Sequence, residues 1–304
     1  MNKALNFDDL PNKLVGTDLP DLTYKVPTIL PTKKAKPFVK WVGGKRGIIK
    51  HLLARLPAKI NNYYEPFVGG GALFYEIAER AKSSYLSDLN ADLVVSYQTI
   101  KTYPRDLIDA LKIHQANHNE EYYYKIRDLQ ETENPIDNSA RFIYLLATCF
   151  NGLYRVNKGN NFNTPIGSYA NPKIVDEENI LLVHNILKNI DIKYQDFSEI
   201  KPSEGDFVYF DPPYHPTNDT SFTKYVRDGF TETKQEKLRD FALSLVKKNV
   251  NIMISNSDTA FINELYEDSK YFIIEKIQAP RVVNCKSDKR QPVFELLITN
   301  KLSR

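Results

Sequence analysis

The sequence predicts an α/β protein whose sheet has helices on both faces and whose chain is interrupted by an inserted, mostly helical lobe. Three observations support this fold class. A strand-like segment at residues 63–67 runs into three glycines and then into a helix-like segment. Helix-like and strand-like segments alternate again over residues 234–299, whereas residues 93–190 form helix-like segments rich in tyrosine and asparagine.

The chain is expected to begin folding near Pro37. Residues 1 to about 35 carry several prolines and mixed charges without a sustained period, which is typical of an extended or partly disordered arm. A short amphipathic helix is predicted at residues 48–56, because its isoleucines and leucines share one helical face before Pro57 ends the pattern.

The sheet elements follow in order along the chain. Strands are predicted at residues 63–67, 83–87 and 207–210, with a helix at 72–80 after the glycine turn. The C-terminal part continues as helix 234–247, strand 250–255, helix 259–267, and strands 271–277 and 293–299. The resulting domains are an arm (1–35), a sheet domain in two pieces (36–92 and 191–304) and the inserted lobe (93–190).

The composition is that of a soluble protein without a disulfide framework. Hydrophobic residues make up 42% and charged residues 26% of 304 residues, and no apolar run approaches the roughly 20 residues that span a bilayer. The N-terminus lacks the apolar core and cleavage site of a signal peptide, so a cytoplasmic protein is expected. Cys149 and Cys285 stand far apart without neighbouring ligands, which favours reduced thiols over a disulfide or a zinc site.

The net charge of +3 is too small to identify a nucleic-acid partner by itself. The distribution of charge is more informative, although each basic cluster alone is more typical of a solvated surface. Three clusters stand out: Lys33, Lys34 and Lys36; Lys40, Lys45 and Arg46; and Arg281, Lys286, Lys289 and Arg290.

The segment from Glu65 to Gly71 ends a predicted strand with three consecutive glycines. Glycine lets a ligand approach the backbone closely at the carboxyl end of a strand, where open α/β sheets bind nucleotides. Asp88 ends the next predicted strand about 20 residues later, a position from which acidic residues accept hydrogen bonds from ribose hydroxyls. The pattern indicates a nucleotide-like cofactor, and a tight turn beside an ordinary surface aspartate is the alternative.

The segment Asp211-Pro212-Pro213-Tyr214 is a more specific signal. Two consecutive prolines fix the backbone and remove two N–H donors directly after a strand that has a buried composition. Such a turn can present the Asp211 carboxylate and the Pro212 carbonyl to an amino group, while the Tyr214 ring offers a stacking surface for a planar base. The alternative is a rigid turn without a chemical role.

These motifs resemble those of the amino-methyltransferases, whose defining motif is the Asp-Pro-Pro-Tyr tetrad. The segment from Phe38 to Lys45 precedes the glycine motif, the lobe and the tetrad, as in the alpha group of DNA adenine methyltransferases. Lobe segments 150–157 and 162–167 are similar to the target-recognition hairpin of the Dam type, especially of the GATC-modifying enzymes of DpnII-like restriction systems. The resemblance spans residues 36–300 and implies an S-adenosylmethionine-dependent, Rossmann-like fold with an inserted target-recognition domain.

The resemblance also assigns residues to three expected sites. The catalytic residues would be Asp211, Pro212 and Tyr214. The cofactor would contact Trp41, Lys45, Glu65, Phe67, Gly69, Gly71, Asp88, Asp196, Phe197 and Asp211, and DNA would contact Lys40, Asn151, Leu153, Arg155, Asn157, Pro165 and Tyr169. The chain departs from the family at Ser168, where an arginine often precedes the tyrosine. If that arginine binds a phosphate, its replacement by serine would change affinity more than base preference.

The function implied by the resemblance is transfer of a methyl group from S-adenosylmethionine to N6 of adenine in GATC of double-stranded DNA, by the modification enzyme of a restriction-modification system. The base would be flipped out of the duplex. No metal and no stable protein partner are expected, apart from functional pairing with a restriction endonuclease. Two alternatives stay open: methylation of RNA or of a protein glutamine, whose tetrads usually open with asparagine in place of Asp211, and a DNA-binding regulator without catalytic activity.

Overall fold

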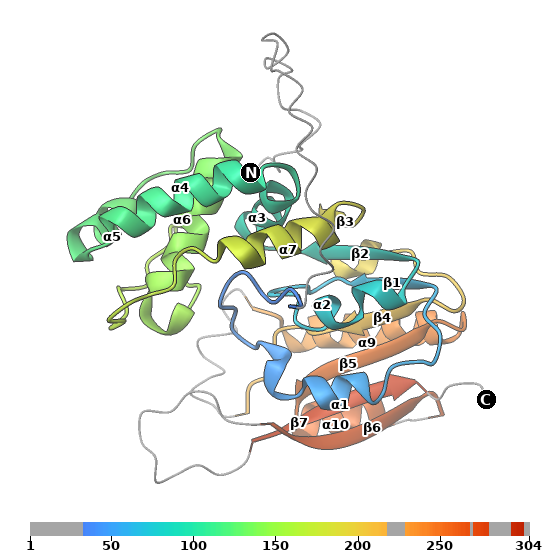
Figure 1. The fold of residues 1–304 in the computed structure, drawn as a ribbon. Helices are drawn as coiled ribbons and strands as arrows, with labels where there is room; N and C mark the ends of the chain where they lie inside the picture. The colour runs from blue at the N-terminus through green and yellow to red at the C-terminus, as the bar shows by residue number, and fades with distance from the viewer. Residues whose placement is uncertain (1–32, 218–228, 268–269, 280–292, 301–304) are drawn as a thin grey trace. The chain divides into compact units, whose positions relative to one another are not determined.

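A computed structural model of the chain describes residues 33–217, 229–267, 270–279 and 293–300, and these belong to one compact unit. Their strands and helices are labelled in Figure 1. The predicted arm at residues 1–35 lies outside the described residues except for its last part, 33–35. Among the described residues, no helix is long and apolar enough to cross a membrane.

The described strands form one seven-stranded sheet, which confirms the predicted α/β class. The strands are β1 (Asn62–Glu65), β2 (Ser83–Asp88), β3 (Asp191–Tyr194), β4 (Phe207–Phe210), β5 (Asn251–Ser257), β6 (Phe272–Ala279) and β7 (Val293–Asn300). Their order is β3-β2-β1-β4-β5-β7-β6. Strands β1 to β5 run parallel, and β7 runs antiparallel to both of its neighbours.

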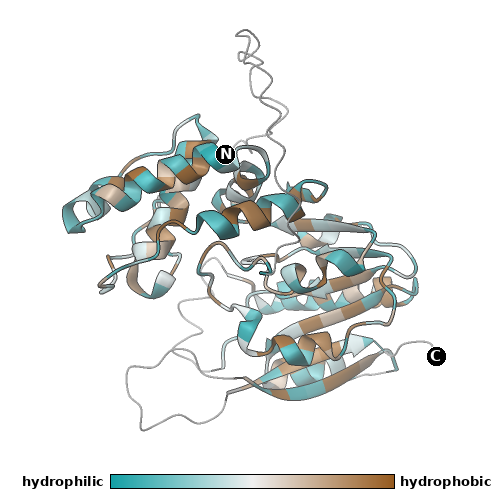
Figure 2. Ribbon diagram, viewed as in Figure 1, coloured by the Kyte–Doolittle hydropathy of each residue, from teal (hydrophilic) through white to brown (hydrophobic). Residues whose placement is uncertain are grey.

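Two hydrophobic cores cover opposite faces of the sheet, because successive side chains of a strand point to opposite faces. On β4, Phe207 and Tyr209 join one core, and Val208 and Phe210 join the other. The first core includes side chains of α1 (Ile49–Leu53), α2 (Phe74–Ile77) and the lobe, and the second those of α9 (Glu232–Val246) and α10 (Ala260–Glu267). Figure 2 shows hydrophobic stretches along the central strands, as expected for strands covered on both faces.

The inserted lobe consists of helices and a short hairpin, which lies between α6 and α7 in the chain. The helices are α3 (Ala91–Thr102), α4 (Pro104–Asn117), α5 (Glu120–Arg127), α6 (Pro135–Thr148) and α7 (Glu177–Leu187). Asn90, Asn119 and Asn134 cap three of them by accepting a main-chain N–H from the first turn, which explains part of the asparagine content. After α6, antiparallel bridges pair Cys149 with Ile166 and Val156 with Phe162 and so close the hairpin.

The predicted boundaries differ from the structure in a few places. The strand predicted at 63–67 ends at Glu65, because Pro66 has no N–H to continue the ladder. Strand β3 is missing from the prediction, because Lys193 and its polar neighbours give this four-residue strand little hydrophobic signal. The other strands agree within two residues, whereas the helix predicted at 48–56 is shortened to α1 and that predicted at 72–80 divides into α2 and a 3-10 turn, Ala78–Arg80.

The strand order brings both sequence motifs to one edge of the sheet. Strand β1 lies between β2 and β4. The strands that follow β1 in the chain, β2 and β3, lie on one side of it, and the later strands β4 and β5 lie on the other side. In open α/β sheets, ligands bind outside the carboxyl ends of the strands at such a switch point. The glycine turn follows β1 and the Asp-Pro-Pro-Tyr turn follows β4, and the two strands are direct neighbours, with Tyr64 opposite Val208.

Candidate active site

Asp211 begins the turn after β4 and forms a buried ion pair with Lys45. The Lys45 ammonium lies 2.8 Å from Oδ2 of Asp211, and both side chains are largely buried. The same ammonium donates a hydrogen bond to the Gly43 carbonyl. The segment before α1 is therefore tied to the end of β4, and two of the residues predicted for the cofactor pocket lie in direct contact.

The second carboxylate oxygen of Asp211, Oδ1, is buried and has no hydrogen-bond partner among the described residues. The pKa of Asp211 is raised to about 6, chiefly by burial and also by the charge of Glu295, while the Lys45 ammonium lowers it. A buried acceptor without a partner is unfavourable. This oxygen is therefore available to a ligand that donates a hydrogen bond.

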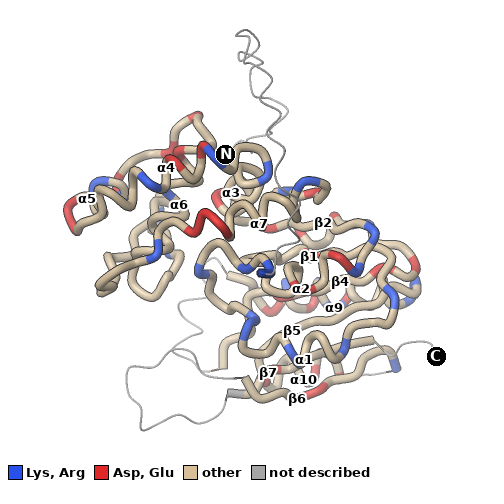
Figure 3. Tube along the Cα trace, viewed as in Figure 1, with Lys and Arg blue, Asp and Glu red and all other residues tan. Residues whose placement is uncertain are grey.

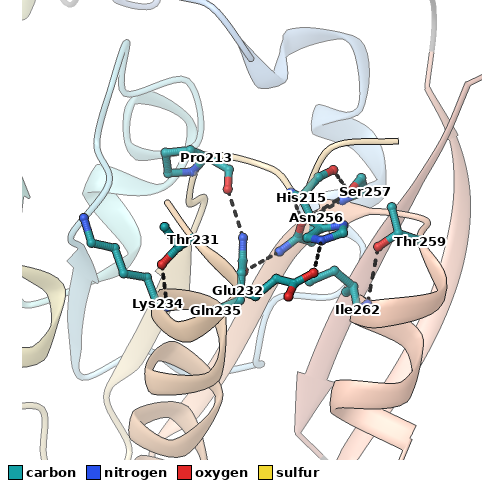
Figure 4. A network of polar contacts seen from close by, with 10 residues as sticks. All are labelled: Pro213, His215, Thr231, Glu232, Lys234, Gln235, Asn256, Ser257, Thr259 and Ile262. Carbon is teal, nitrogen blue, oxygen red and sulfur yellow. Dashed lines mark hydrogen bonds and ion pairs between the residues drawn. The ribbon is translucent and has the colours of Figure 1, made fainter. Parts of the chain in front are cut away.

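The main chain of the turn is clamped by side chains from α9 and β5 (Figure 4). Gln235 donates to the Pro213 carbonyl at 3.0 Å and accepts from the side-chain amide of Asn256 at 3.0 Å. Asn256 in turn accepts the main-chain N–H of His215 at 3.1 Å. These contacts hold the main chain of the turn in place. Within the described residues the Pro212 carbonyl accepts no hydrogen bond, so it remains available as an acceptor for a ligand.

Tyr214 is held between Lys45 and Glu295. Its hydroxyl donates to Oε2 of Glu295 on β7 at 2.7 Å, and the Lys45 ammonium lies over its ring, 4.8 Å from the centroid. Burial raises the pKa of Tyr214 well above its usual value, with further contributions from Asp211 and Glu295. The hydroxyl therefore stays protonated and acts as a donor.

The glycine turn after β1 is shaped by two aromatic side chains. Gly69 and Gly71 adopt left-handed backbone angles, with φ of +48° and +69°. A Cβ atom at Gly69 would lie 2.7 Å from Trp41, and one at Gly71 would lie 2.8 Å from the Tyr97 hydroxyl. The space that the sequence led us to expect for a ligand at these two glycines is thus filled by Trp41 and Tyr97. Asp88 supports the turn by accepting the N–H of Gly69 at 3.0 Å.

Three carboxyl groups come from the carboxyl ends of neighbouring strands: Glu65 from β1, Asp88 from β2 and Asp211 after β4. Burial raises the pKa of Glu65 to about 8, although the Tyr63 hydroxyl donates to its Oε2 at 2.8 Å. Burial likewise raises the pKa of Asp88. Glu65 therefore stays protonated at neutral pH and can donate a hydrogen bond, whereas Asp211 is ionised and is paired with the Lys45 ammonium.

Phe67 and Phe197 form a small aromatic cluster near the ends of β1 and β3. Their rings stack with centroids 5.5 Å apart, and Phe230 packs against Phe67 at 5.6 Å. Asp196 accepts the N–H of Ser198 at 3.0 Å and so caps the 3-10 turn that carries Phe197. The structure therefore brings the predicted Phe67 and Phe197 together, while the Asp196 carboxylate has a local capping role.

In the hairpin of the lobe, Arg155 is exposed and lies against Asn163. Its Nε donates to the Asn163 side-chain oxygen at 2.7 Å, and its Nη2 donates to the Asn163 main-chain carbonyl at 2.9 Å. Asn157 accepts the N–H groups of Gly159 and Asn161 through its side-chain oxygen and so closes the hairpin loop. Of the other predicted DNA contacts, Asn151 and Pro165 are exposed and Leu153 is half-buried.

Lys40 connects the segment before α1 to the hairpin. A Cβ atom at Gly152, where φ is +64°, would lie 2.7 Å from Cβ of Lys40. The Lys40 ammonium lies 4.1 Å from the ring centroid of Tyr169. The next residue, Trp41, packs on Tyr154 of the hairpin with ring centroids 5.7 Å apart. This segment therefore contacts both the glycine turn and the lobe.

The comparison with known families agrees with this arrangement. Residues 41–281 match the model of the D12 class N6 adenine-specific DNA methyltransferases. The chain belongs to this family. It is 42% identical to the type II methyltransferase M1.LlaDCHI of Lactococcus lactis subsp. cremoris, over 87% of this chain and 95% of that protein. It is 41% identical to the type II methyltransferase M.MjaIII of Methanocaldococcus jannaschii (88% and 99%) and 31% identical to the DNA adenine methylase of Escherichia coli K12 (87% and 95%).

The chain is therefore an adenine-specific DNA methyltransferase that acts on N6, and its methyl donor is S-adenosylmethionine. This membership removes RNA or glutamine methylation and a silent regulator as interpretations of the tetrad. The residues predicted for the cofactor pocket are compatible with this donor, because Asp211, with a pKa of about 6, is ionised at neutral pH and attracts a sulfonium cation, while Glu65, with a pKa of about 8, is a neutral hydrogen-bond donor. The described residues of the methyltransferase contain no cluster of His, Cys, Asp and Glu that could hold a metal ion.

Of the three basic clusters predicted from the sequence, the first is paired with acidic residues and the third lies outside the described residues. Figure 3 shows Lys and Arg spread over the lobe and the sheet layer. The first cluster is paired with acids: Lys33 with Glu178 at 2.9 Å, Lys34 with Glu76 at 3.0 Å and Lys36 with Asp176 at 3.1 Å. The third cluster (Arg281, Lys286, Lys289 and Arg290) and Cys285 lie outside the described residues.

Cys149 is a buried free thiol, and burial raises its pKa to about 11.

Four polar residues of the site are missing from the sequence prediction, namely Gln235, Asn256, Asn163 and Glu295. For two of these residues, the sequence contains a pattern from which a role in the site could have been predicted. Asn256 lies near the carboxyl end of a buried strand, like Asp88, and Glu295 is a charged residue within a predicted hydrophobic strand. Gln235 and Asn163 stand in ordinary polar surroundings in the sequence, so only the tertiary structure identifies their partners.

Proposed function

We propose that this methyltransferase modifies the adenine of GATC in double-stranded DNA and serves as the modification enzyme of a restriction-modification system. The observation that carries the chemical part is the buried, unpartnered Oδ1 of Asp211 next to the Pro212 carbonyl. Two acceptors on one rigid turn match the two N–H bonds of an exocyclic amino group. The restriction context is supported by two relatives, which are named type II methyltransferases.

Asp211 and Pro212 act by orienting the amino group. The lone pair of adenine N6 is conjugated with the ring and is a poor nucleophile. Hydrogen bonds from N6 to the Asp211 carboxylate and the Pro212 carbonyl favour a more tetrahedral nitrogen and direct its lone pair. With a pKa of about 6, Asp211 is ionised at neutral pH, and it can accept the N6 proton once that nitrogen has become positively charged.

Tyr214 receives the flipped base. Adenine N6 is inaccessible to an enzyme within the duplex stack, so the base must be extruded at a cost of a few kcal/mol. Stacking on an aromatic ring contributes about 1–3 kcal/mol per base and offsets part of this cost. Because the Lys45 ammonium lies over one face of the Tyr214 ring, the base stacks on the opposite face.

S-adenosylmethionine, when bound, supplies an activated methyl group on a sulfonium centre. Trp41, Phe67 and Phe197 provide aromatic surface for the cofactor, and Gly69 and Gly71 shape the turn beneath it. The ionised Asp211 attracts its positive charge, and Asp88 accepts hydrogen bonds from its hydroxyls. The proposed cofactor residues are Trp41, Lys45, Glu65, Phe67, Gly69, Gly71, Asp88, Asp196, Phe197 and Asp211.

Arg155 reads a guanine at the outer base pair. The two contacts with Asn163 use the edge of the guanidinium that carries Nε, so the edge between Nη1 and Nη2 is left for two parallel hydrogen bonds to O6 and N7 of guanine. Lys40 reads the first guanine, and Leu153 and Pro165 lie near the thymine methyl group. Asn151, Asn157 and Tyr169 complete the proposed DNA contacts.

The proposal is tested with labelled S-adenosylmethionine and short duplexes that contain one GATC or one permuted site. Methyl transfer should require GATC, and Asp211→Ala should retain part of its cofactor binding but lose transfer. Sequencing of DNA from cells that express the protein should show N6-methyladenine in GATC. Modification concentrated at another motif would contradict the specificity and point to Ser168. Failure to protect such DNA from an endonuclease that cleaves GATC only when its adenine is unmethylated would contradict the restriction role.

A further inference from the structure

Glu295 is a charged residue that the fold places beside the catalytic turn. It lies on β7 directly opposite Ser257 of β5, and the two residues that follow it on β7, Leu296 and Leu297, are buried. Glu295 itself is half-buried. Its partner is the Tyr214 hydroxyl, which donates to Oε2 at 2.7 Å. Within the described part of the chain, this is the side-chain hydrogen bond that Glu295 makes.

The other contacts of the turn hold its main chain and leave the Tyr214 ring to Glu295 and Lys45. Gln235 binds the Pro213 carbonyl, and the His215 N–H and carbonyl are bound by Asn256 and Ser257. Each of these contacts ends on a main-chain atom. Rotation of the Tyr214 side chain is limited instead by the Lys45 ammonium over its face and by Glu295 at its hydroxyl.

We propose that Glu295 is a positioning residue that sets the orientation of the Tyr214 ring for the extruded adenine, an inference that rests on the base-stacking role proposed above for Tyr214. Glu295 acts through the tyrosine hydroxyl and does not touch the base. An aromatic ring already fixed in the stacking orientation loses less side-chain entropy when the base arrives. Loss of the hydrogen bond therefore weakens extrusion without removing the stacking surface.

The charge of Glu295 allows a second measurement, the pH dependence of kcat/KM, that is independent of base extrusion. Its carboxylate is one of the groups that raise the pKa of Asp211. The charged and titratable groups around Asp211 are Lys45, Glu65, Tyr63, Tyr209, Tyr214 and Glu295. Glu295→Gln keeps an acceptor for the Tyr214 hydroxyl but removes the negative charge. This variant should retain extrusion, and the acid limb of its kcat/KM profile should move to lower pH, which a purely structural role would not cause.

The experiment uses the full chain, the product S-adenosylhomocysteine and a GATC duplex with 2-aminopurine at the target adenine. Glu295→Ala should reduce the extrusion equilibrium about tenfold, the order expected for a hydrogen bond to a charged acceptor. Tyr214→Phe, which keeps the ring and removes the same hydrogen bond, should have a similar effect. The double variant should be no worse than either single one, because both changes remove one interaction. Glu275→Ala on β6, which breaks an ion pair with Arg55, is the control and should leave extrusion unchanged.

Three outcomes would overturn the inference: normal extrusion by Glu295→Ala, normal extrusion by Tyr214→Phe, or effects of the two that add fully in the double variant. If thermal unfolding shows that Glu295→Ala does not fold, Tyr214→Phe decides alone. A wild-type protein that methylates GATC without any 2-aminopurine signal, or a Tyr214→Ala variant with normal extrusion, would instead contradict the stacking role of Tyr214 on which the inference rests.

Discussion

The ion pair between Lys45 and Asp211 makes the acidity of the proposed catalytic carboxyl group a testable quantity. Lys45→Met keeps much of the side-chain volume and removes the cation 2.8 Å from Asp211. An opposite charge this close lowers a carboxyl pKa by roughly 1–3 pH units, so its removal should raise the pKa of Asp211 from about 6 to roughly 7–9. At pH 7.5 the ionised fraction of Asp211 would then fall from about 97% to between about 76% and 3%.

The assay is the kcat/KM for methylation of a GATC duplex between pH 5.5 and 9.5, because its acid limb reports the pKa of the free enzyme. The limb should lie near pH 6 in the wild type and between roughly pH 7 and 9 in Lys45→Met, with activity regained at high pH. Lys36→Met, which breaks a surface ion pair with Asp176, should leave the limb in place. A limb that stays near pH 6 in Lys45→Met would refute the reasoning, and a uniform loss at every pH would assign Lys45 to cofactor binding instead.

Three further predictions concern stability and specificity. Glu65 has a pKa of about 8 when folded and 4.5 as an ordinary value, so the folded state retains a proton that the unfolded chain releases. Stability should therefore fall as pH rises from about 4.5 to 8, and Glu65→Gln should flatten this slope in thermal unfolding; an unchanged slope would contradict the burial argument. Gly69→Ala should lower the free energy of unfolding by about 1–3 kcal/mol, from a left-handed backbone and a clash with Trp41. In urea titrations, Gly44→Ala, where the nearest atom would be 3.4 Å away, is its control, and equal losses would contradict the prediction. Arg155→Ala should relax discrimination at the outer base pairs by about 1–3 kcal/mol, measured as kcat/KM on sites with one outer substitution, and unchanged discrimination would remove Arg155 from base reading.

Local sequence patterns are sufficient for those elements whose signal is local. The strand before Asp211 has a fully apolar or aromatic composition, and the strand before Gly69 has two tyrosines; both are followed by proline or glycine, so both are predicted close to their observed ends. Strand β3 lacks such a pattern, because its place is set by pairing of Asp191 with Tyr85 on β2. The pairings within the site are beyond local patterns for the same reason, since nothing near Glu295 in the sequence indicates a tyrosine 81 residues away.

The glycines show how a sequence signal can have a physical cause that differs from the expected one. Three glycines after a strand indicate a cofactor turn, and the expected cause is space for a ligand. In the structure, Gly69 and Gly71 are required by left-handed backbone angles and by the close approach of Trp41 and Tyr97. Trp41 is itself one of the predicted pocket residues, so the glycine turn would shape the proposed pocket indirectly, through an aromatic side chain that also packs on Tyr154 of the lobe. Substitution at Gly69 should therefore disturb the packing of Trp41 against the hairpin of the lobe as well as the proposed cofactor pocket.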